Sequence, residues 1–262
     1  MIETTEAYGF NFAYPAGDTA VGACLRDYGE FGRIGSSLAA QLSAGGTFID
    51  VGANIGAYAL PVSRRAQRVL AIEAHPGLAG LLERNVRDNQ IHNVELLNAV
   101  ADATSGEVQF PAPDLDYIAN FGALGIGRSE GPTVPVRAVT LDEIAPASVA
   151  FVKIDVEGWE VNVLGGAARV LQRARPYWLI EASSPEIVDR MVRAGYRTYW
   201  FWDPFVTPGA PKAKWQGPRR GDLSILAVDE RRSQPTGMVE ALPRAPQPTT
   251  TAGFTYLHAF GI

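Results

Sequence analysis

Short apolar runs alternate with amphipathic stretches along most of the chain from residue 47 onward. Apolar runs of this length predict buried strands, and apolar residues three or four positions apart predict helices. Strands are predicted at residues 48–51, 69–73, 94–100, 149–155 and 177–181. Helices are predicted between them, at residues 55–65, 76–89, 159–173 and 185–194. Such alternation is typical of an α/β fold, with a mostly parallel sheet and helices on both faces.

Two further apolar strands are predicted at residues 197–202 and 223–228. No helical pattern separates them, and parallel neighbours need a crossover connection, which is usually a helix. We therefore expect these two strands to form an antiparallel hairpin at the C-terminal end of the sheet.

Three regions lie outside the regular alternation. Residues 1–46 are rich in aromatic residues and glycine, and we expect them to cap the domain formed by residues 47–228. Within that domain, residues 103–140 form a loop insertion around a predicted hairpin. Long loops inside compact domains are typically lids or binding loops, or else disordered. The proline-rich tail at residues 229–262 is expected to be extended.

Composition narrows the class of protein. Of 262 residues, 47% are apolar and 19% charged, and the net charge is 23 − 28 = −5. This mixture excludes wholesale disorder, and the acidic balance disfavours a nucleic-acid partner. No apolar run reaches the roughly 18 residues that a membrane span needs. Cys24 is the only cysteine, which excludes an internal disulfide. No basic residue precedes Arg26 and no signal-like apolar run is present, so a cytoplasmic protein is expected.

The main chemical signal is Asp-Val-Gly-Ala-Asn-Ile-Gly, from Asp50 to Gly56, which ends one predicted strand and opens a helix. Gly52 and Gly56 allow a tight turn and a close approach of the backbone to a ligand. Open α/β sheets bind ligands beyond the carboxyl ends of their strands. Glu73 ends the next strand, where its carboxylate can accept hydrogen bonds from both hydroxyls of a ribose.

Two cofactors fit this arrangement. A dinucleotide fold requires Gly-x-Gly-x-x-Gly, whereas Gly52 and Gly56 are four residues apart with Asn54 between them. The carboxylate of Asp50 would oppose a pyrophosphate but suits a cationic amino group or sulfonium. The pattern favours S-adenosylmethionine over a nicotinamide dinucleotide, and a strand-to-helix turn without a ligand is the structural alternative.

Five segments resemble, in order and spacing, the FkbM-type family of class I S-adenosylmethionine-dependent methyltransferases. They are Phe-Ile-Asp-Val-Gly-Ala-Asn-Ile-Gly at 48–56, Thr-Leu-Asp-Glu-Ile at 140–144, Phe-Val-Lys-Ile-Asp-Val-Glu-Gly at 151–158, Val-Leu-Gly-Gly-Ala at 163–167 and Ile-Glu at 180–181. The resemblance extends from about Tyr28 to about Arg193. It implies a Rossmann-like class I methyltransferase sheet, with S-adenosylmethionine as cofactor and S-adenosylhomocysteine as product.

The resemblance also implies roles for individual cofactor-binding residues. Gly52, Asn54 and Gly56 would line the methionine part of the cofactor, with Asp50 beneath them. Glu73 would hold the ribose, and Ala99 would lie near the adenine.

Two residues outside the main motifs also match family positions. Glu30 resembles an acidic position ahead of the first motif and would close over the cofactor. Asn120, in Asn-Phe-Gly at 120–122, resembles a family Asn-x-Gly and would contact cofactor or acceptor. The family often has Glu-Pro where this chain has Glu73-Ala-His75-Pro. Residues beyond about 200 match nothing in the family, so acceptor specificity is expected there.

Three carboxylates follow strands at the same predicted sheet edge: Asp155, Glu157 and Glu181. An alcohol acceptor must lose a proton during methyl transfer, and a nearby base assists this. Asp155 is the expected functional carboxylate nearest the methyl group. The group could hold a base of raised pKa or a divalent cation, and no metal ligands are assigned. Asp155 could instead cap the following helix.

Acceptor contacts are harder to predict. Trp215, in a basic loop, is a candidate acceptor contact, and the alternative is a solvated loop. His75 could act as a base, but capping the helix that begins at Pro76 is favoured. The segment from Asp155 to Gly158 differs from the Asn/Asp-Pro-Pro-Tyr/Phe turn of base-amine methylation.

The predicted activity is O-methylation of a hydroxyl on a sugar or natural product. The expected partner is a small-molecule or glycan acceptor, with no nucleic acid or membrane, and the oligomeric state is open. Alternatives are N-methylation of a small molecule or peptide, a NAD(P)-dependent oxidoreductase, or a non-catalytic protein that binds S-adenosylmethionine.

Overall fold

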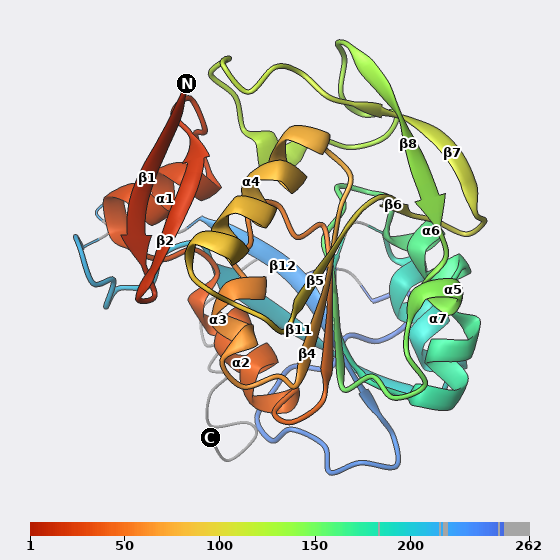
Figure 1. The fold of residues 1–262 in the computed structure, drawn as a ribbon. Helices are drawn as coiled ribbons and strands as arrows, with labels where there is room; N and C mark the ends of the chain where they lie inside the picture. Colours follow the sequence, from red (N-terminus) through yellow and green to blue (C-terminus); the bar gives the residue numbers. More distant parts are fainter. Residues whose placement is uncertain (183, 215, 217–219, 246, 249–262) are drawn as a thin grey trace.

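A seven-stranded sheet forms the centre of the protein, in the order β11-β12-β10-β9-β3-β4-β5 (Figure 1). The computed structural model describes residues 1–182, 184–214, 216, 220–245 and 247–248. The strands are β3 (Thr47–Val51), β4 (Arg68–Glu73), β5 (Val94–Asn98), β9 (Phe151–Ile154), β10 (Tyr177–Glu181), β11 (Tyr196–Pro204) and β12 (Gly221–Asp229). Only β12 runs antiparallel to its neighbours, β10 and β11. The predicted mostly parallel sheet with a C-terminal antiparallel hairpin is confirmed.

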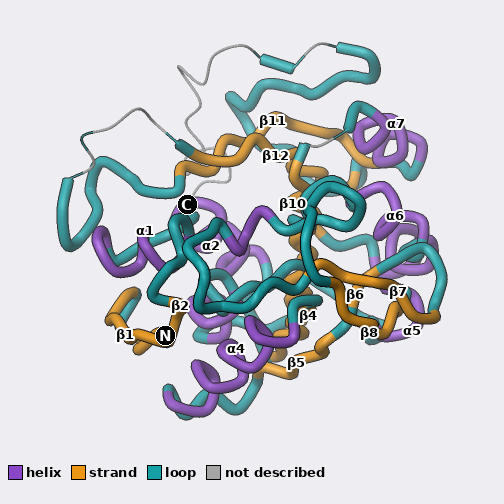
Figure 2. Tube along the Cα trace, turned by 90° about the horizontal axis from the view of Figure 1, so that it is seen from above, coloured by secondary structure: helices purple, strands orange, loops and turns teal. Residues whose placement is uncertain are grey.

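Helices cover both faces of this sheet (Figures 1 and 2). They are α2 (Arg33–Leu42), α3 (Ala59–Ser63) and α4 (Pro76–Asp88) on one face, and α5 (Leu141–Ile144), α6 (Glu160–Gly165) and α7 (Glu186–Arg193) on the other. Successive side chains of a strand point to opposite faces. Phe48 accordingly joins the apolar cluster that contains Leu82 of α4, and Ile49 joins the cluster that contains Met191 of α7.

Two predicted helices are shorter than the apolar pattern suggested. The predicted helix at residues 55–65 begins only at Ala59, because the preceding residues form the turn around Gly56. The predicted helix at residues 159–173 breaks after α6 and resumes as a short π-helical segment, η2 (Val170–Ala174). At Gly166 a Cβ would collide with the carbonyl oxygen of Asp102, so the break permits a close backbone approach.

The N-terminal segment contains a hairpin that the sequence pattern did not predict. Strands β1 (Ile2–Ala7) and β2 (Phe10–Pro15) are antiparallel, and α1 (Val21–Tyr28) follows them. Buried Asn85 of α4 holds the hairpin: its Oδ1 accepts from Ala13 N at 2.6 Å and its Nδ2 donates to Ala13 O at 3.1 Å. The hairpin therefore packs beside α4, as Figure 1 shows, on the same apolar cluster as the sheet.

Two strands of the insertion, β7 (Gly106–Pro111) and β8 (Thr133–Val139), form a small second sheet with β6 (Val100–Ala101), which precedes the insertion. The strand order is β6-β8-β7. The connection from β7 to β8 contains the short 3-10 helix η1 (Phe121–Ala123) and lies against the residues that follow β3 and β9. It is held at Ala119, which donates to Gly17 O at 3.1 Å and accepts from Thr19 N at 3.0 Å. This loop is therefore fixed to the N-terminal segment.

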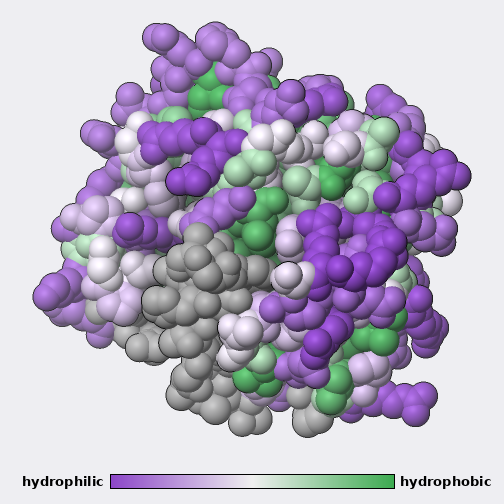
Figure 3. Space-filling view, turned by 90° about the horizontal axis from the view of Figure 1, so that it is seen from below, coloured by the Kyte–Doolittle hydropathy of each residue, from purple (hydrophilic) through white to green (hydrophobic). Residues whose placement is uncertain are grey.

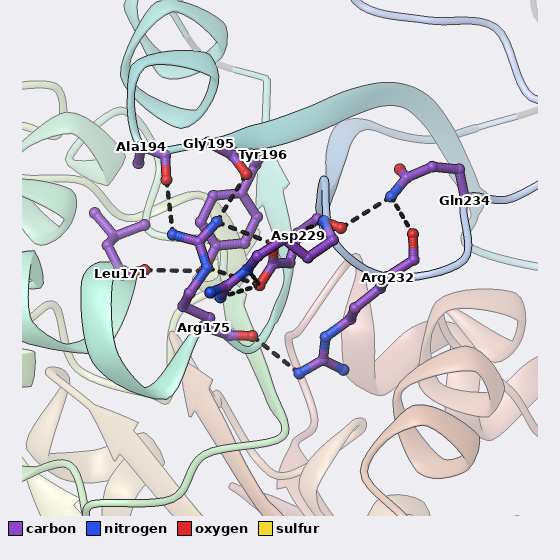
Figure 4. Close-up of polar contacts among 9 residues, drawn as sticks. Leu171, Arg175, Ala194, Gly195, Tyr196, Asp229, Arg232 and Gln234 are labelled. Atoms are coloured by element: carbon purple, nitrogen blue, oxygen red, sulfur yellow. Dashed lines mark hydrogen bonds and ion pairs between the residues drawn. The ribbon is translucent and has the colours of Figure 1, made fainter.

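An ion-pair network around the buried carboxylate of Asp229 closes one end of the β11–β12 hairpin (Figure 4). Asp229 accepts from Arg175 Nε at 2.7 Å and Nη2 at 3.0 Å, and from Arg231 Nη2 at 2.7 Å. Arg175 also donates to the carbonyl oxygens of Ala194 and Gly195. The two guanidinium groups hold the pKa of Asp229 well below its usual range. Each buried polar group of this network has a close partner.

The surface seen from below in Figure 3 is largely hydrophilic, with only small separated hydrophobic areas. Among the helices that the structure describes, none combines the length and apolar character needed to cross a bilayer.

Candidate active site

The carboxyl ends of β3 and β9 meet at the glycine-containing turn. Gly52 has φ +79°, and a Cβ there would collide with the carbonyl oxygen of Asp155. Glycine therefore permits both the left-handed backbone and the close contact between the two strand ends. Asn54 is also left-handed, with φ 51°. Its backbone N–H donates to Glu73 Oε2 at 2.8 Å, which ties the turn to the end of β4.

A cleft opens above this turn and encloses about 1050 Å³ of empty space, including its open mouth. Its lining includes residues predicted for cofactor, acceptor or catalysis: Asp50, Gly52, Asn54, Glu73, Ala99, Asn120, Asp155 and Glu157. The structure thus brings together residues from β3, β4, β9 and the insertion.

Asn120 belongs to the part of the insertion that covers the turn. Its Oδ1 accepts from Gly122 N at 3.0 Å and caps η1. A Cβ on Gly122 would lie 3.6 Å from Asn54 Nδ2, so the loop lies against the turn. Phe121 is only 2% exposed and anchors this part of the loop in the core.

Other predicted cofactor residues lie outside the cleft lining. Gly56 has φ +95°, and a Cβ there would lie 2.5 Å from Leu60 Cδ1 and 2.6 Å from Leu82 Cδ1. Its visible role is therefore to allow tight helix packing. Glu30 is fully buried, pairs with Arg33 at 3.3 Å and accepts a hydrogen bond from the backbone N–H of Thr207. Trp215, the predicted acceptor contact, lies outside the described residues.

The three predicted catalytic carboxylates lie close together. Asp155, Glu157 and Glu181 each place an oxygen within 4.8 Å of the other two. Burial, with a contribution from the charge of Asp155, raises the pKa of Glu157 to about 7 and the pKa of Glu181 to about 9. Glu181 Oε2 is buried and has no hydrogen-bond partner in the described part of the chain. Oxygen donors of this type also suit a hard divalent cation.

Lys153 is a site residue that the sequence analysis missed. It is 7% exposed, and its Nζ lies 3.1 Å from Asp155 Oδ2 and 3.6 Å from Asp50 Oδ1. Burial alone would lower the pKa of Lys153, but the charges of Asp155 and Asp50 raise it above the usual value. The sequence signal for this residue was the presence of a lysine in the otherwise apolar strand β9.

Asp203 and Asp222 are two further site carboxylates that were missed. They lie directly opposite each other on β11 and β12. Asp203 accepts hydrogen bonds from Gly35 N at 3.1 Å and from the Tyr58 hydroxyl. Burial raises the pKa of Asp203 to about 6. Burial and the charges of Asp155 and Asp203 raise the pKa of Asp222 to about 8. Asp222 borders both the main cleft and a smaller second cavity.

His75 is engaged at both ring nitrogens. Nδ1 accepts from Gly77 N at 3.1 Å and Leu78 N at 3.3 Å, so it caps α4 as the sequence favoured. Because Nδ1 accepts, Nε2 is the nitrogen that donates to Pro113 O, at 3.0 Å. Burial lowers the pKa of His75. These contacts give His75 a structural role at the edge of the cleft.

The Methyltransferase FkbM domain matches residues 50–198, more than half of the chain. The chain belongs to the FkbM methyltransferase family. The match begins at Asp50 of the glycine turn and ends within β11. Asp203 and Asp222 therefore lie beyond the matched region of this FkbM-family protein.

Several solved structures are similar to this FkbM-family protein. The FkbM methyltransferase from Methylobacillus flagellatus KT has 19% identity and TM-score 0.47, covering 69% of this chain and 43% of its own. The precorrin-6y C5,15-methyltransferase from Geobacter metallireducens GS-15 has 15% identity and TM-score 0.47, covering 74% and 85%. The TYW2 protein from M. jannaschii in complex with AdoMet has 11% identity and TM-score 0.42, covering 86% and 84%.

The aligned part thus spans less than half of the Methylobacillus protein. No curated protein matches the sequence at a significant level. The family membership rests on the domain match.

Proposed function

We propose that this protein transfers the methyl group of S-adenosylmethionine to a hydroxyl group of a sugar or natural-product acceptor. The observation that carries the proposal is the buried carboxylate of Asp50 beneath the cleft. It is 0% exposed, and neither oxygen has a hydrogen-bond partner among the described residues. Its ion pair with Lys153 Nζ, at 3.6 Å, is long and is shared with Asp155, so the buried charge is incompletely compensated. The cationic end of S-adenosylmethionine would offset the remaining cost.

The remaining cofactor contacts follow from the lining of the cleft. The backbone at Gly52 and Asn54 would hold the methionine part. Glu73 ends β4 and accepts from Asn54 N and His75 N at 2.8 Å each, so its carboxylate is held in place for the ribose hydroxyls. Ala99, whose N–H donates to Glu73 O at 3.1 Å, would lie beside the adenine.

The acceptor would approach from the side of the cleft that Asp155 and Glu157 border. When bound, S-adenosylmethionine supplies an electrophilic methyl group, which the acceptor oxygen must approach in line to about 3 Å. Asp155 follows β9 beside the glycine turn, and we place it nearest that methyl group. Its pairing with Lys153 leaves Oδ1 to orient the acceptor hydroxyl.

Calorimetry with S-adenosylmethionine and S-adenosylhomocysteine tests the cofactor site. We expect Glu73→Ala to lose about 1–3 kcal/mol of binding free energy, roughly tenfold or more in Kd. Glu83→Ala, on an exposed position of α4, is the matched control and should bind like wild type. Binding of a nicotinamide dinucleotide in place of both ligands would overturn the assignment.

Transfer from ¹³C-methyl-labelled S-adenosylmethionine to a panel of methyl glycosides, phenols and amines tests the acceptor class. We expect methyl ethers among the products. N-methyl products alone would favour the amine alternative, and tight binding without any transfer would favour a non-catalytic protein. Loss of transfer with a chelator and recovery with Mg²⁺ would place a cation at the carboxylates around Asp155.

A further inference from the structure

We propose that Asp222 is the general base that removes the proton from the acceptor hydroxyl. This inference rests on the proposed methyl transfer to a hydroxyl and assigns the proton to one carboxylate. Asp222 is the second residue of β12 and lies at the junction of the main cleft and the second cavity. A group at that junction can reach both an acceptor in the cleft and the space behind it.

Glu181 has an oxygen without a hydrogen-bond partner among the described residues, but it does not line the cleft. Asp155, Glu73 and Asp203 are already engaged. Asp155 Oδ2 is paired with Lys153 Nζ at 3.1 Å. Both oxygens of Glu73 accept backbone N–H groups. Asp203, directly across the strand pair, accepts from Gly35 N and Tyr58. Within the described residues, the structure gives the side chain of Asp222 no hydrogen bond and no ion pair, so its oxygens remain available to an acceptor.

Glu157 is the closest competitor for this role. It also borders the cleft, but it lies beneath the insertion, where a Cβ on Gly125 would be 2.6 Å from the Glu157 carbonyl oxygen. It does not border the second cavity, whereas Asp222 does. Glu157 therefore supplies the comparison variant in the test.

The charges around Asp222 come from three strands: Asp203 on β11, Glu181 on β10, and Lys153 on β9 with Asp155 and Glu157 after it. Burial is the main cause that raises the pKa of Asp222 to about 8, and the negative groups, which outnumber Lys153, add to it. A general base is most effective when its pKa lies near the working pH. The surroundings thus suit Asp222 to accept a proton and release it again.

The proposed step transfers one methyl group and one proton. An acceptor oxygen lone pair forms the new O–CH₃ bond while the hydroxyl proton moves to a carboxylate oxygen of Asp222. The C–S bond of the sulfonium breaks, and its electron pair stays on sulfur, which gives neutral S-adenosylhomocysteine. Protonated Asp222 then returns its proton to solvent.

Carbon NMR tests the proton affinity without an acceptor. Protein labelled at the aspartate carboxyl carbons is saturated with S-adenosylhomocysteine, and the Asp222 signal is identified by its loss in Asp222→Asn. We expect this signal to titrate with a midpoint near pH 8. A midpoint below pH 6 would overturn the proposal. Failure to bind S-adenosylhomocysteine would instead count against the proposed function.

Kinetics with the methylated compounds of the acceptor panel tests the role itself. We expect Asp222→Asn to lower kcat/KM by about 10²–10⁴-fold and to abolish its rise between pH 7 and 9, with S-adenosylmethionine affinity within about twofold. Glu157→Gln should keep that rise. The reverse outcome, with the rise lost only in Glu157→Gln, would make Glu157 the base. If no compound in the panel is methylated, the carbon titration decides.

Discussion

The aspartates at the two ends of the β11–β12 hairpin have neighbours of opposite charge. At one end, where Tyr196 is opposite Asp229, two arginines bind the carboxylate (Figure 4). At the other end, Asp203 is opposite Asp222, and Lys153 is the cation among the charged groups described near them. The pKa of Asp229 is lowered, whereas burial and neighbouring acids raise the pKa of Asp222 to about 8.

The two ends of this strand pair therefore differ in role. Asp229 stabilises the fold, whereas Asp222 borders the cleft in which we propose methyl transfer. Asp229 has its charge and hydrogen bonds satisfied, so it contributes to stability. Asp222 faces a like charge, which is unfavourable for directly opposed residues of a sheet. Perturbed proton affinity concentrates at functional sites, where stability is commonly sacrificed for activity. The hairpin is therefore stabilised by ion pairs at one end, and at the other end it carries the aspartate that we propose as the general base.

The largest effect is expected at the Asp229 end. Asp229→Asn should lower the free energy of unfolding by about 3–5 kcal/mol, because breaking a buried ion pair leaves Arg175 without its counter-ion. Urea unfolding followed by circular dichroism measures this change. Glu240→Gln, which breaks the exposed pair with Arg197, is the control and should cost about 1 kcal/mol or less. Equal losses in the two variants would contradict the structural role of Asp229.

An effect of opposite sign is expected at the other end. Asp222→Asn should raise the free energy of unfolding by about 1–3 kcal/mol at pH 8, because it removes a buried like charge opposite Asp203. The same urea experiment measures it. A loss of stability would show that the Asp222 carboxylate is held by favourable contacts, and the contrast between the two ends would disappear.

The smallest effect is a difference in pH dependence. Asp222 has a raised pKa in the folded protein. Its contribution to the free energy of unfolding is therefore complete below about pH 4 and is lost as the pH rises through about 8. Asp229 has a lowered pKa, so its contribution is present above about pH 4 and is lost on further acidification. The wild-type Tm should fall from pH 5 to pH 9, and it should fall less in Asp222→Asn. Parallel curves for the two proteins would rule out Asp222 as a source of the fall.

The central fold was predictable because its strands are buried on both faces and are therefore continuously apolar. The glycine turn from Asp50 to Gly56 was also predictable, because its glycines are close together in the sequence and directly follow an apolar strand. The N-terminal hairpin was not, because β1 is mostly exposed and its tight turn uses Tyr8 and Gly9, with φ 55° and 71°. That turn lacks the Asn-Gly or Asp-Gly signature of such hairpins.

The site was predictable where its residues are close in sequence. Asp155 and Glu157 follow one strand, and Glu73 ends another, so their positions at the sheet edge follow from the strand pattern. Asp203 and Asp222 are brought together only by the register of β11 and β12 across a long loop. Neither lies in a local motif or within the matched family domain, so sequence reasoning had no means of pairing them.

The strand order also sets a sequence of events during synthesis. Strand β12 lies between β10 and β11, although it is made after both. When the chain has grown to residue 200, the parts that form the cofactor cleft from Asp50 to Ala99 already exist, but β11 has no neighbour in the sheet. When β12 pairs with both strands, it connects β11 to β10 and also brings Asp222 to the cleft. On our proposal, a growing chain would therefore contain the residues that hold S-adenosylmethionine before it contained the general base.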